Sequence, residues 1–210
     1  PIYNHYNKLR EAIKSILQQT KIKSCELNLE ILIVNDGSTQ ECKEALLEIE
    51  SQIKQVKLFH HENNSGPAAA RNTGIREAKG EIISFLDADD LWPLDKLELL
   101  YPYLKDEDIH IIGGKIEYRV EDDSKLPEIR FQNEQNHLNH VHLGAILVRR
   151  KVFDNGLLFN TSTRYSEDVN WWLQIRENNL NILLVEEVTL IYRVHGTNMS
   201  IGKDFKELEM

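Results

Sequence analysis

Cysteines and long hydrophobic runs are scarce in this chain of 210 residues. Its two cysteines, Cys25 and Cys42, are too few for a disulfide framework and favour a reducing compartment. No apolar run approaches the roughly 20 residues that a membrane-spanning helix needs, and the first residues lack the pattern of a signal peptide. We therefore expect a cytoplasmic protein without a transmembrane helix.

Basic residues are also fewer than acidic residues. Lysine and arginine number 25 against 34 aspartates and glutamates, which gives a formal net charge of −9. That balance argues against broad binding of nucleic acid, although a local basic pocket stays open. Neither an internal repeat nor a low-complexity linker divides the chain, and 41% of its residues are hydrophobic. We expect a single domain, residues 1–210, with a substantial core.

Helical and strand patterns alternate along the first half of the chain. Apolar residues at helical spacing predict helices, and short β-branched runs between them predict strands. The predicted helices cover 5–19, 40–53, 68–78 and 94–104, and the predicted strands cover 30–34, 56–60, 81–86 and 109–112. Such alternation predicts an α/β fold, with a Rossmann-like, mostly parallel sheet and helices on both of its faces.

The alternation breaks after Gly113 and Gly114. The polar residues 121–140 predict a loop. Shorter patterns predict strands over 115–120, 144–148, 182–185 and 188–194 and a helix over 166–178. We expect the sheet to be mixed in this second half.

The first four residues, Pro1 to Asn4, read as the exit of a strand that turns into a helix. An apolar strand is expected directly before them. We therefore expect the domain to begin upstream of Pro1.

Three carboxylates, Asp87, Asp89 and Asp90, follow directly on the predicted strand 81–86. Ligands of an open α/β sheet bind beyond the carboxyl ends of its strands. Carboxylates this close repel one another unless a cation or hydrogen-bond donors compensate, and oxygen ligands suit Mg²⁺ or Mn²⁺. The stretch therefore predicts a cation site, with a solvated loop that caps the helix near Pro93 as the alternative.

Three histidines, His137, His140 and His142, look like metal ligands, but their spacing fits no helical pair and no cysteine accompanies them. We interpret them as part of a polar loop that enters a strand. Trp171 and Trp172 are adjacent, so a helix cannot bury both on one face. One of the two is expected in the core.

Short motifs in order along the chain carry a resemblance to a known family. They are Pro1-Ile2-Tyr3-Asn4, Val34-Asn35-Asp36-Gly37-Ser38-Thr39, residues 64–74 with Arg71, Leu86-Asp87-Ala88-Asp89-Asp90, and Glu167-Asp168 before an aromatic helix. Together they resemble family 2 of the inverting glycosyltransferases, whose members have the A-type glycosyltransferase fold. The resemblance runs over nearly the whole chain, and Asn35 stands where the family motif has an aspartate.

The resemblance implies a nucleotide-sugar donor, of the uridine type, bound by residues 1–112. Tyr3 would stack on the base, a contact worth roughly 1–3 kcal/mol. Asp36 would accept a base N–H, Arg71 would reach the base or a phosphate, and Asp87 would contact the ribose or the ion. The structural alternatives are a core tyrosine for Tyr3, a helix cap for Asp36 and a surface ion pair for Arg71.

The resemblance also implies Asp89 as the direct ligand of Mn²⁺ or Mg²⁺, with His195 as a further ligand and Asp90 orienting its neighbours or capping a helix. Asp168 is the expected general base for the acceptor hydroxyl, and Glu167 would orient it or hold the acceptor. The alternative for His195 is a structural histidine that bonds a loop. The alternative for Glu167 and Asp168 is a helix start, where acidic side chains are favoured by the helix dipole. One base suffices, because inversion needs no covalent intermediate.

We therefore expect a metal-dependent inverting glycosyltransferase that moves a sugar from a UDP-sugar to a glycan or a lipid-linked acceptor, in surface polysaccharide synthesis. Residues 113–210 would bind the acceptor, and a peripheral contact with the inner face of the cell membrane is compatible with that substrate. A sugar nucleotidyltransferase would need a glycine-rich basic loop, which residues 1–10 lack. A non-catalytic nucleotide- or glycan-binding module is the third alternative, against which Asp89 and Asp168 argue.

Overall fold

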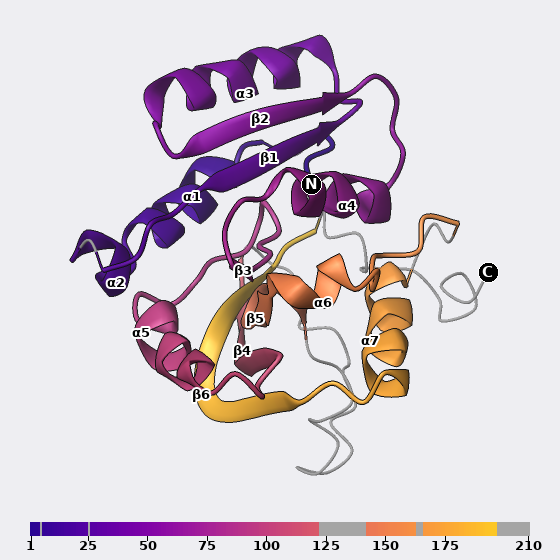
Figure 1. Ribbon diagram of the computed structural model, residues 1–210. Helices are drawn as coiled ribbons and strands as arrows, with labels where there is room; N and C mark the ends of the chain where they lie inside the picture. Colours follow the sequence, from indigo (N-terminus) through magenta and orange to yellow (C-terminus); the bar gives the residue numbers. More distant parts are fainter. Residues whose placement is uncertain (5, 25, 122–141, 163–165, 197–210) are drawn as a thin grey trace.

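The computed structural model describes the chain apart from residues 5, 25, 122–141, 163–165 and 197–210. Helices and strands alternate along the described part, as Figure 1 shows. The first half holds α1 (Leu9–Leu17), α2 (Thr20–Lys23), β1 (Ile31–Asp36), α3 (Gln40–Gln52), β2 (Val56–His61), α4 (Pro67–Glu77), β3 (Ile82–Ile83), α5 (Lys96–Leu100) and the 3₁₀ helix η1 (Tyr101–Lys105). The second half holds β4 (Ile111–Val120), the 3₁₀ helix η3 (Leu143–Ala145), β5 (Ile146–Arg149), α6 (Arg150–Asp154), α7 (Glu167–Glu177) and β6 (Ile182–Val194).

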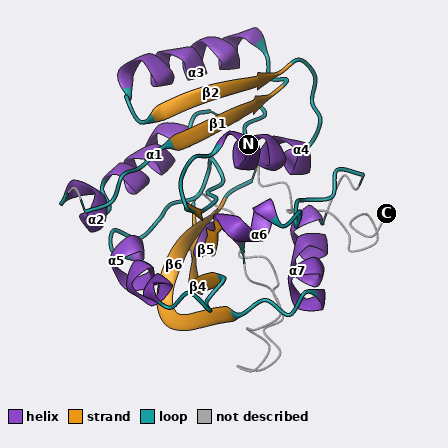
Figure 2. Cartoon of the chain, viewed as in Figure 1, coloured by secondary structure: helices purple, strands orange, loops and turns teal. Residues whose placement is uncertain are grey.

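The strands form two sheets, drawn in orange in Figure 2. β1 and β2 pair in parallel, with Ile31 opposite Val56. The second sheet has the order β3-β5-β4-β6, in which β5 runs antiparallel to β3 and β4 while β4 runs parallel to β6. The prediction of an α/β fold with a mixed sheet in its second half is therefore confirmed.

Helices cover the sheet of β1 and β2. α3 buries Cys42, Leu46 and Ile49, and in the view of Figure 1 it lies on the far side of β2 from α1 and α4. α4 packs against β1 and has Pro67 in its first turn, where a missing N–H leaves no helical bond unmade. Among the described residues, none of the helices combines the length and the apolar character that crossing a bilayer requires.

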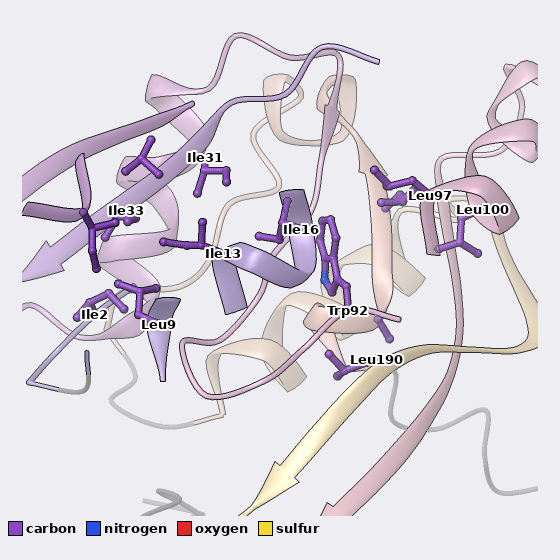
Figure 3. Close-up of a cluster of buried hydrophobic side chains, with 14 of the residues drawn as sticks. Ile2, Leu9, Ile13, Ile16, Ile31, Ile33, Trp92, Leu97, Leu100 and Leu190 are labelled. Atoms are coloured by element: carbon purple, nitrogen blue, oxygen red, sulfur yellow. The ribbon is translucent and has the colours of Figure 1, made fainter. Parts of the chain in front are cut away.

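One hydrophobic cluster joins α1 to the sheet beside it. Ile13 and Ile16 of α1 lie near Ile31 and Ile33 of β1, with Trp92 next to Ile16 (Figure 3). Their spacing along α1 is the helical one that the sequence shows, so the apolar face of this helix and the buried face of β1 select each other.

A second cluster surrounds Trp171. Its ring stacks on those of Phe153 and Phe159, with centroid distances of 5.7 and 5.4 Å. Trp171 is fully buried, so it is the core residue of the tryptophan pair.

Gly113 and Gly114 do not interrupt the strand pattern, contrary to the prediction. β4 runs through both, and its register against β6 shifts there. A Cβ at Gly113 would lie 2.7 Å from Cγ2 of Ile146, and one at Gly114 would lie 2.3 Å from the Glu187 carbonyl oxygen. These glycines therefore allow close contact between strands rather than a turn.

Other boundaries also differ from the prediction. β3 covers only Ile82–Ile83 of the predicted 81–86, and the single strand β6 replaces the two predicted at 182–185 and 188–194. The helix predicted at 94–104 is split into α5 and η1, because Pro102 has no N–H to continue the α-helical ladder. The short helices α2 and α6 were not predicted, since neither has a full amphipathic repeat.

Candidate active site

The acidic loop after β3 is fixed onto β6. Leu91 and Ile191 exchange backbone hydrogen bonds, with N–O distances of 3.0 and 2.9 Å. Close by, Oδ1 of Asp90 accepts a hydrogen bond from the backbone N–H of Arg193 at 3.0 Å. Asp90 thus holds the backbone of Arg193, and the loop lies at the carboxyl end of β6, where His195 follows.

Arg193 ties this loop to the rest of the fold. Its side chain is buried, and Nε donates to the carbonyl oxygen of Asp89. Nη1 forms ion pairs with Glu11 of α1 and with Glu121, the residue after β4. Because a buried guanidinium needs such partners, Arg193 links three elements to the Asp89 backbone.

Asp89 and His195, the two expected metal ligands, lie side by side. Nε2 of His195 is 3.1 Å from Oδ2 of Asp89. The histidine side chain is buried, whereas 31% of the Asp89 side chain is exposed. A carboxylate open to solvent beside an imidazole nitrogen is a donor set that suits Mn²⁺.

Arg71 joins the acidic loop to the start of α7. Its Nη1 donates to Oε1 of Glu167, and its Nη2 donates to Oδ1 of Asp87 at 3.3 Å. The guanidinium is buried over the ring of Phe159, 5.7 Å from the centroid. Burial alone would lower the pKa of this arginine, but the charges of Asp87, Glu167 and Asp168 outweigh burial and raise that pKa. The surface ion pair considered as the alternative for Arg71 is therefore wrong.

Asp168 lies in the first turn of α7, beside Glu167. Its Oδ1 accepts a hydrogen bond from the backbone N–H of Val169 at 2.8 Å, and the side chain is partly exposed. Asp168 contributes to the raised pKa of Arg71, which also contacts Asp87. The two aspartates therefore lie around the same guanidinium, from elements far apart in the sequence.

Asp90 supplies a buried oxygen to a second cluster of possible cation ligands. Asp87, Asp90 and His142 each offer an atom within 4.8 Å of the others. Oδ2 of Asp90 has no hydrogen-bond partner among the described residues. Burial, together with the charges of Asp87 and Asp89, raises the pKa of Asp90 to about 8. An unpartnered buried oxygen amid negative charge fits a cation close by.

His142, which the sequence analysis assigned to a polar loop, is a neighbour of this site. Its Nδ1 accepts a hydrogen bond from the backbone N–H of Gly144 at 3.0 Å, so in the neutral ring Nε2 carries the proton. Nε2 lies 3.9 Å from Oδ2 of Asp87. In this conformation His142 faces Asp87 as a donor rather than as a metal ligand. His137 and His140 lie outside the described residues.

Asp36 closes a loop at the end of β1. Its Oδ1 accepts a hydrogen bond from the backbone N–H of Ser65 at 2.9 Å and lies 2.7 Å from Nδ1 of His61. Its Oδ2 accepts a hydrogen bond from the N–H of Gly66 at 2.8 Å. The buried carboxylate therefore holds the loop that enters α4, and the helix cap of α3 is made instead by Thr39.

Gly37 follows Asp36 and has a positive φ of 71°. A Cβ at this position would lie 2.4 Å from the backbone nitrogen of Asn64. The turn after β1 and the loop before α4 therefore touch through backbone atoms, which only glycine permits here.

Tyr3 lies on an exposed turn, with 49% of its surface accessible. The backbone N–H of Asn4 donates to Oγ of Ser38 at 3.1 Å, and Oδ1 of Asn4 accepts a hydrogen bond from the N–H of Thr39 at 2.8 Å. The core-tyrosine alternative is therefore wrong, and the ring is free to meet a flat partner.

Comparison with known proteins identifies the family. The family model described as "Glycosyl transferase family 2" matches residues 1–177. The chain belongs to this family. The resemblance seen in the short motifs is thereby confirmed, whereas the individual roles of the site residues stay predictions.

Curated relatives of this chain bear glycosyltransferase names. "Uncharacterized glycosyltransferase RC0461" of Rickettsia conorii is 34% identical over 205 residues, which are 94% of this chain and 33% of the relative. The Escherichia coli "UDP-Glc:alpha-D-GlcNAc-diphosphoundecaprenol beta-1,3-glucosyltransferase WfgD" is 29% identical over 215 residues, which are 100% of this chain and 80% of the relative. The chain spans about one third of the length of the Rickettsia relatives that it matches.

Solved structures share the fold. S. aureus TarS in complex with UDP-GlcNAc matches with a TM-score of 0.75 and 18% identity, over 94% of this chain and 58% of the TarS chain. The mannosyltransferase PcManGT from Pyrobaculum calidifontis, in complex with GDP-Man and Mn²⁺, matches with a TM-score of 0.75 and 21% identity, over 94% of this chain and 56% of its own. The predicted A-type glycosyltransferase fold is therefore confirmed.

Proposed function

We propose that this chain is a metal-dependent inverting glycosyltransferase domain that moves a sugar from a UDP-sugar to a lipid-linked glycan acceptor. The observation that carries the proposal is the pair of contacts made by Arg71, which reaches Asp87 and Glu167 at once. It gathers the acidic loop and the first turn of α7 around one point. Membership of family 2 supports the reaction class.

The donor base binds near the carboxyl end of β1 in this proposal. Tyr3 offers an exposed ring for stacking. Oδ2 of Asp36 accepts a hydrogen bond from Gly66 and keeps a second lone pair for a base N–H. TarS is named with UDP-GlcNAc and WfgD is named for UDP-Glc, which favours uridine over guanosine.

Asp89 and His195 would hold the cation, since their ligand atoms lie 3.1 Å apart. The unpartnered oxygen of Asp90 belongs to the same acidic loop, and a cation nearby would favour its charged form against the burial and repulsion that raise its pKa to about 8. Bound here, Mn²⁺ or Mg²⁺ supplies charge neutralisation for the departing diphosphate, which is worth several kcal/mol. Because the loop is fixed onto β6, both side chains are preorganised. The PcManGT complex with Mn²⁺ supports such an ion.

Asp168 acts as the general base. It takes the proton of the acceptor hydroxyl as the hydroxyl oxygen attacks the anomeric carbon. The bond between that carbon and the diphosphate breaks, and the nucleotide leaves with the electron pair. Glu167, paired with Arg71, fixes the first turn of α7 and thereby positions Asp168. A single displacement of this kind inverts the configuration at the sugar carbon.

The acceptor is a lipid-linked sugar diphosphate in this proposal, because WfgD is named for such a substrate and aligns with all of this chain. An acceptor anchored in lipid places the reaction at a membrane surface, and we propose the cytoplasmic face and the assembly of a surface polysaccharide as its setting. Residues 113–210 then supply the acceptor side.

The test is a donor screen with Mn²⁺ and a short polyprenyl-diphosphate GlcNAc acceptor. We expect UDP release from one UDP-sugar, loss of release with EDTA, and loss of release in Asp168→Asn. Preferential turnover of GDP-Man would contradict the uridine assignment. Binding of a UDP-sugar without turnover by any acceptor would favour a non-catalytic module.

A further inference from the structure

Three aromatic side chains that the proposed mechanism does not use lie together beside the acidic loop. Tyr118 of β4 and Tyr192 of β6 are directly opposite each other in the parallel pairing of these strands, and their ring centroids are 5.5 Å apart. The ring of His142 meets that of Tyr192 edge to face, also with 5.5 Å between the centroids. All three residues are partly exposed. We refer to them as the aromatic cluster.

The backbone around Gly144 holds His142 in the aromatic cluster. The N–H of Gly144 donates to Nδ1 of His142 at 3.0 Å, and its carbonyl accepts a hydrogen bond from Nζ of the buried Lys96 at 2.5 Å. A Cβ at Gly144 would lie 2.9 Å from Cδ1 of Leu190 in β6. Close packing of this backbone against β6 therefore brings the imidazole to Tyr192 and fixes its position.

The aromatic cluster borders two acids of the acidic loop. Nε2 of His142 lies 3.9 Å from Oδ2 of Asp87, which is too far for a direct hydrogen bond. In the neutral ring Nε2 carries the proton, because Nδ1 is an acceptor. A hydroxyl both donates and accepts, so a single hydroxyl can bridge this N–H and the carboxylate. Burial, and after it the charge of Asp90, raises the pKa of Tyr118, so its phenol stays protonated at neutral pH.

The aromatic cluster and the proposed cation ligands lie on opposite faces of β6. Successive residues of a strand point to alternate faces, and His195 follows Tyr192 by three positions. In agreement with this alternation, Arg193 and His195 both contact Asp89, whereas Tyr192 contacts His142. The acidic loop therefore separates the cation side from the aromatic cluster.

This combination of groups suits a pyranose ring. One face of such a ring presents C–H groups, which are attracted to the negative face of an aromatic side chain. The hydroxyls around its edge need both donors and acceptors, and His142 and Asp87 offer one of each. A lipid tail would use the rings but would leave the donor and the carboxylate without a use.

We propose that the aromatic cluster is the sugar-binding platform for the acceptor, whose terminal pyranose ring packs against Tyr118 and Tyr192. One hydroxyl of that ring is held between Nε2 of His142 and Oδ2 of Asp87. The inference rests on the proposed function, because inversion requires the acceptor to approach from the side opposite to the departing nucleotide. With the diphosphate beside Asp89, that side is the one that carries the aromatic cluster.

Tyr192→Leu tests the platform, because leucine keeps an apolar side chain but lacks the aromatic face. The probe is the short polyprenyl-diphosphate GlcNAc, with a UDP-sugar and Mn²⁺. We expect the KM for this acceptor to rise about threefold to tenfold in Tyr192→Leu, while Tyr192→Phe stays close to wild type. The affinity for UDP should be unchanged in both. Tyr103→Leu, at an exposed tyrosine of η1, is the matched control.

Two results of this kinetic test would overturn the proposal. One is an unchanged acceptor KM in Tyr192→Leu. The other is a loss of UDP affinity as large as the rise in acceptor KM, because it would assign the ring to the donor. If Tyr192→Leu folds poorly, Tyr118→Leu takes its place with the same expected results.

A binding measurement separates this inference from the proposed function. Saturation-transfer NMR with methyl N-acetyl-α-glucosaminide, in the presence of UDP and Mn²⁺, should detect the sugar ring protons with wild type and with Tyr192→Phe. The signal should be lost with Tyr192→Leu and with Tyr118→Leu. This pattern in a protein that transfers no sugar would contradict the transferase reaction and leave the platform standing. Equal signals in wild type and both leucine variants, or none in wild type, would overturn the platform whatever the transferase activity.

Discussion

Nε2 of His195 lies 3.1 Å from Oδ2 of Asp89, although 106 positions separate the two residues in the sequence. They meet because the loop after β3 pairs with β6 through Leu91 and Ile191. Arg193 adds a side-chain contact to the carbonyl of Asp89. The distance between the two side chains is thus set by the pairing of the loop after β3 with β6.

Asp89→Asn should remove the dependence of UDP affinity on Mn²⁺. The amide loses the negative charge that a divalent ion requires, so we expect the affinity in Mn²⁺ to fall about tenfold or more, toward the value in EDTA. Isothermal titration calorimetry with and without Mn²⁺ measures this. Asp95→Asn, at an exposed residue of the same segment, is the matched control. Full Mn²⁺-dependent binding in Asp89→Asn would contradict the ligand assignment.

Asp168→Asn should bind the donor normally and transfer sugar about 10²–10⁴ times more slowly. The asparagine keeps the shape of the side chain but cannot accept the acceptor proton. Product formation and the dissociation constant of UDP-sugar are measured side by side. Glu177→Gln, an exposed acid at the other end of α7, should leave both unchanged. Normal turnover by Asp168→Asn would show that another residue is the general base.

Arg71→Ala should destabilise the fold by about 3–5 kcal/mol at neutral pH, because it leaves Asp87 and Glu167 close together without their cation. Urea unfolding measures the loss. Arg76→Ala, exposed on the same helix, should cost far less. A loss below about 1 kcal/mol in Arg71→Ala would show that the bridge does not hold the site together.

The loss of stability in Arg71→Ala should become smaller at low pH. Burial alone would raise the pKa of Asp87, but Arg71 above all, with His142 and the N-terminal amine, lowers it below 3.8. A carboxyl with a lowered pKa contributes stability above its unfolded pKa and loses it as pH falls. The difference in free energy of unfolding between wild type and Arg71→Ala should therefore decrease as the pH falls below about 4. A difference that stays constant with pH would show that the charge of Asp87 does not contribute to stability through Arg71.

Lys96 predicts a pH dependence of stability with the same sign, at higher pH and in another part of the core. Its Nζ donates to the carbonyl of Gly144 at 2.5 Å and lies 4.0 Å from the centroid of the Trp92 ring. Burial lowers the pKa of Lys96 well below 10.5, so the unfolded chain binds more protons and stability rises with pH. Relative to Lys96→Met, wild type should gain free energy of unfolding as the pH rises toward 10.5, the ordinary pKa of lysine. A difference that is flat across this range would contradict the sign.

Local patterns predict most of the first half of the fold. β1, α3, β2 and α4 lie within two residues of their predicted bounds, because each has a clear apolar period and a turn signal at its end. β6 and the Gly113–Gly114 segment were misjudged, since their continuity depends on pairing between strands far apart in the sequence. A local pattern cannot report a register shift.

The sequence predicts which residues belong to the candidate site better than it predicts the contacts between them. The acids at 87–90 and 167–168 stand out because they follow a strand and begin a helix. The Arg71 bridge between them depends on the packing of α4 against α7 and the acidic loop, which sequence spacing does not encode. The contact between His142 and Asp87 was not predicted for the same reason, because it arises only in the folded chain.

Gly37 limits how the turn beside the proposed donor site can be redesigned. Any larger residue there would push the turn after β1 off the loop before α4, because the two touch through backbone atoms. Libraries aimed at new donors should keep Gly37 constant and randomise Tyr3, whose exposed ring can change without moving the main chain.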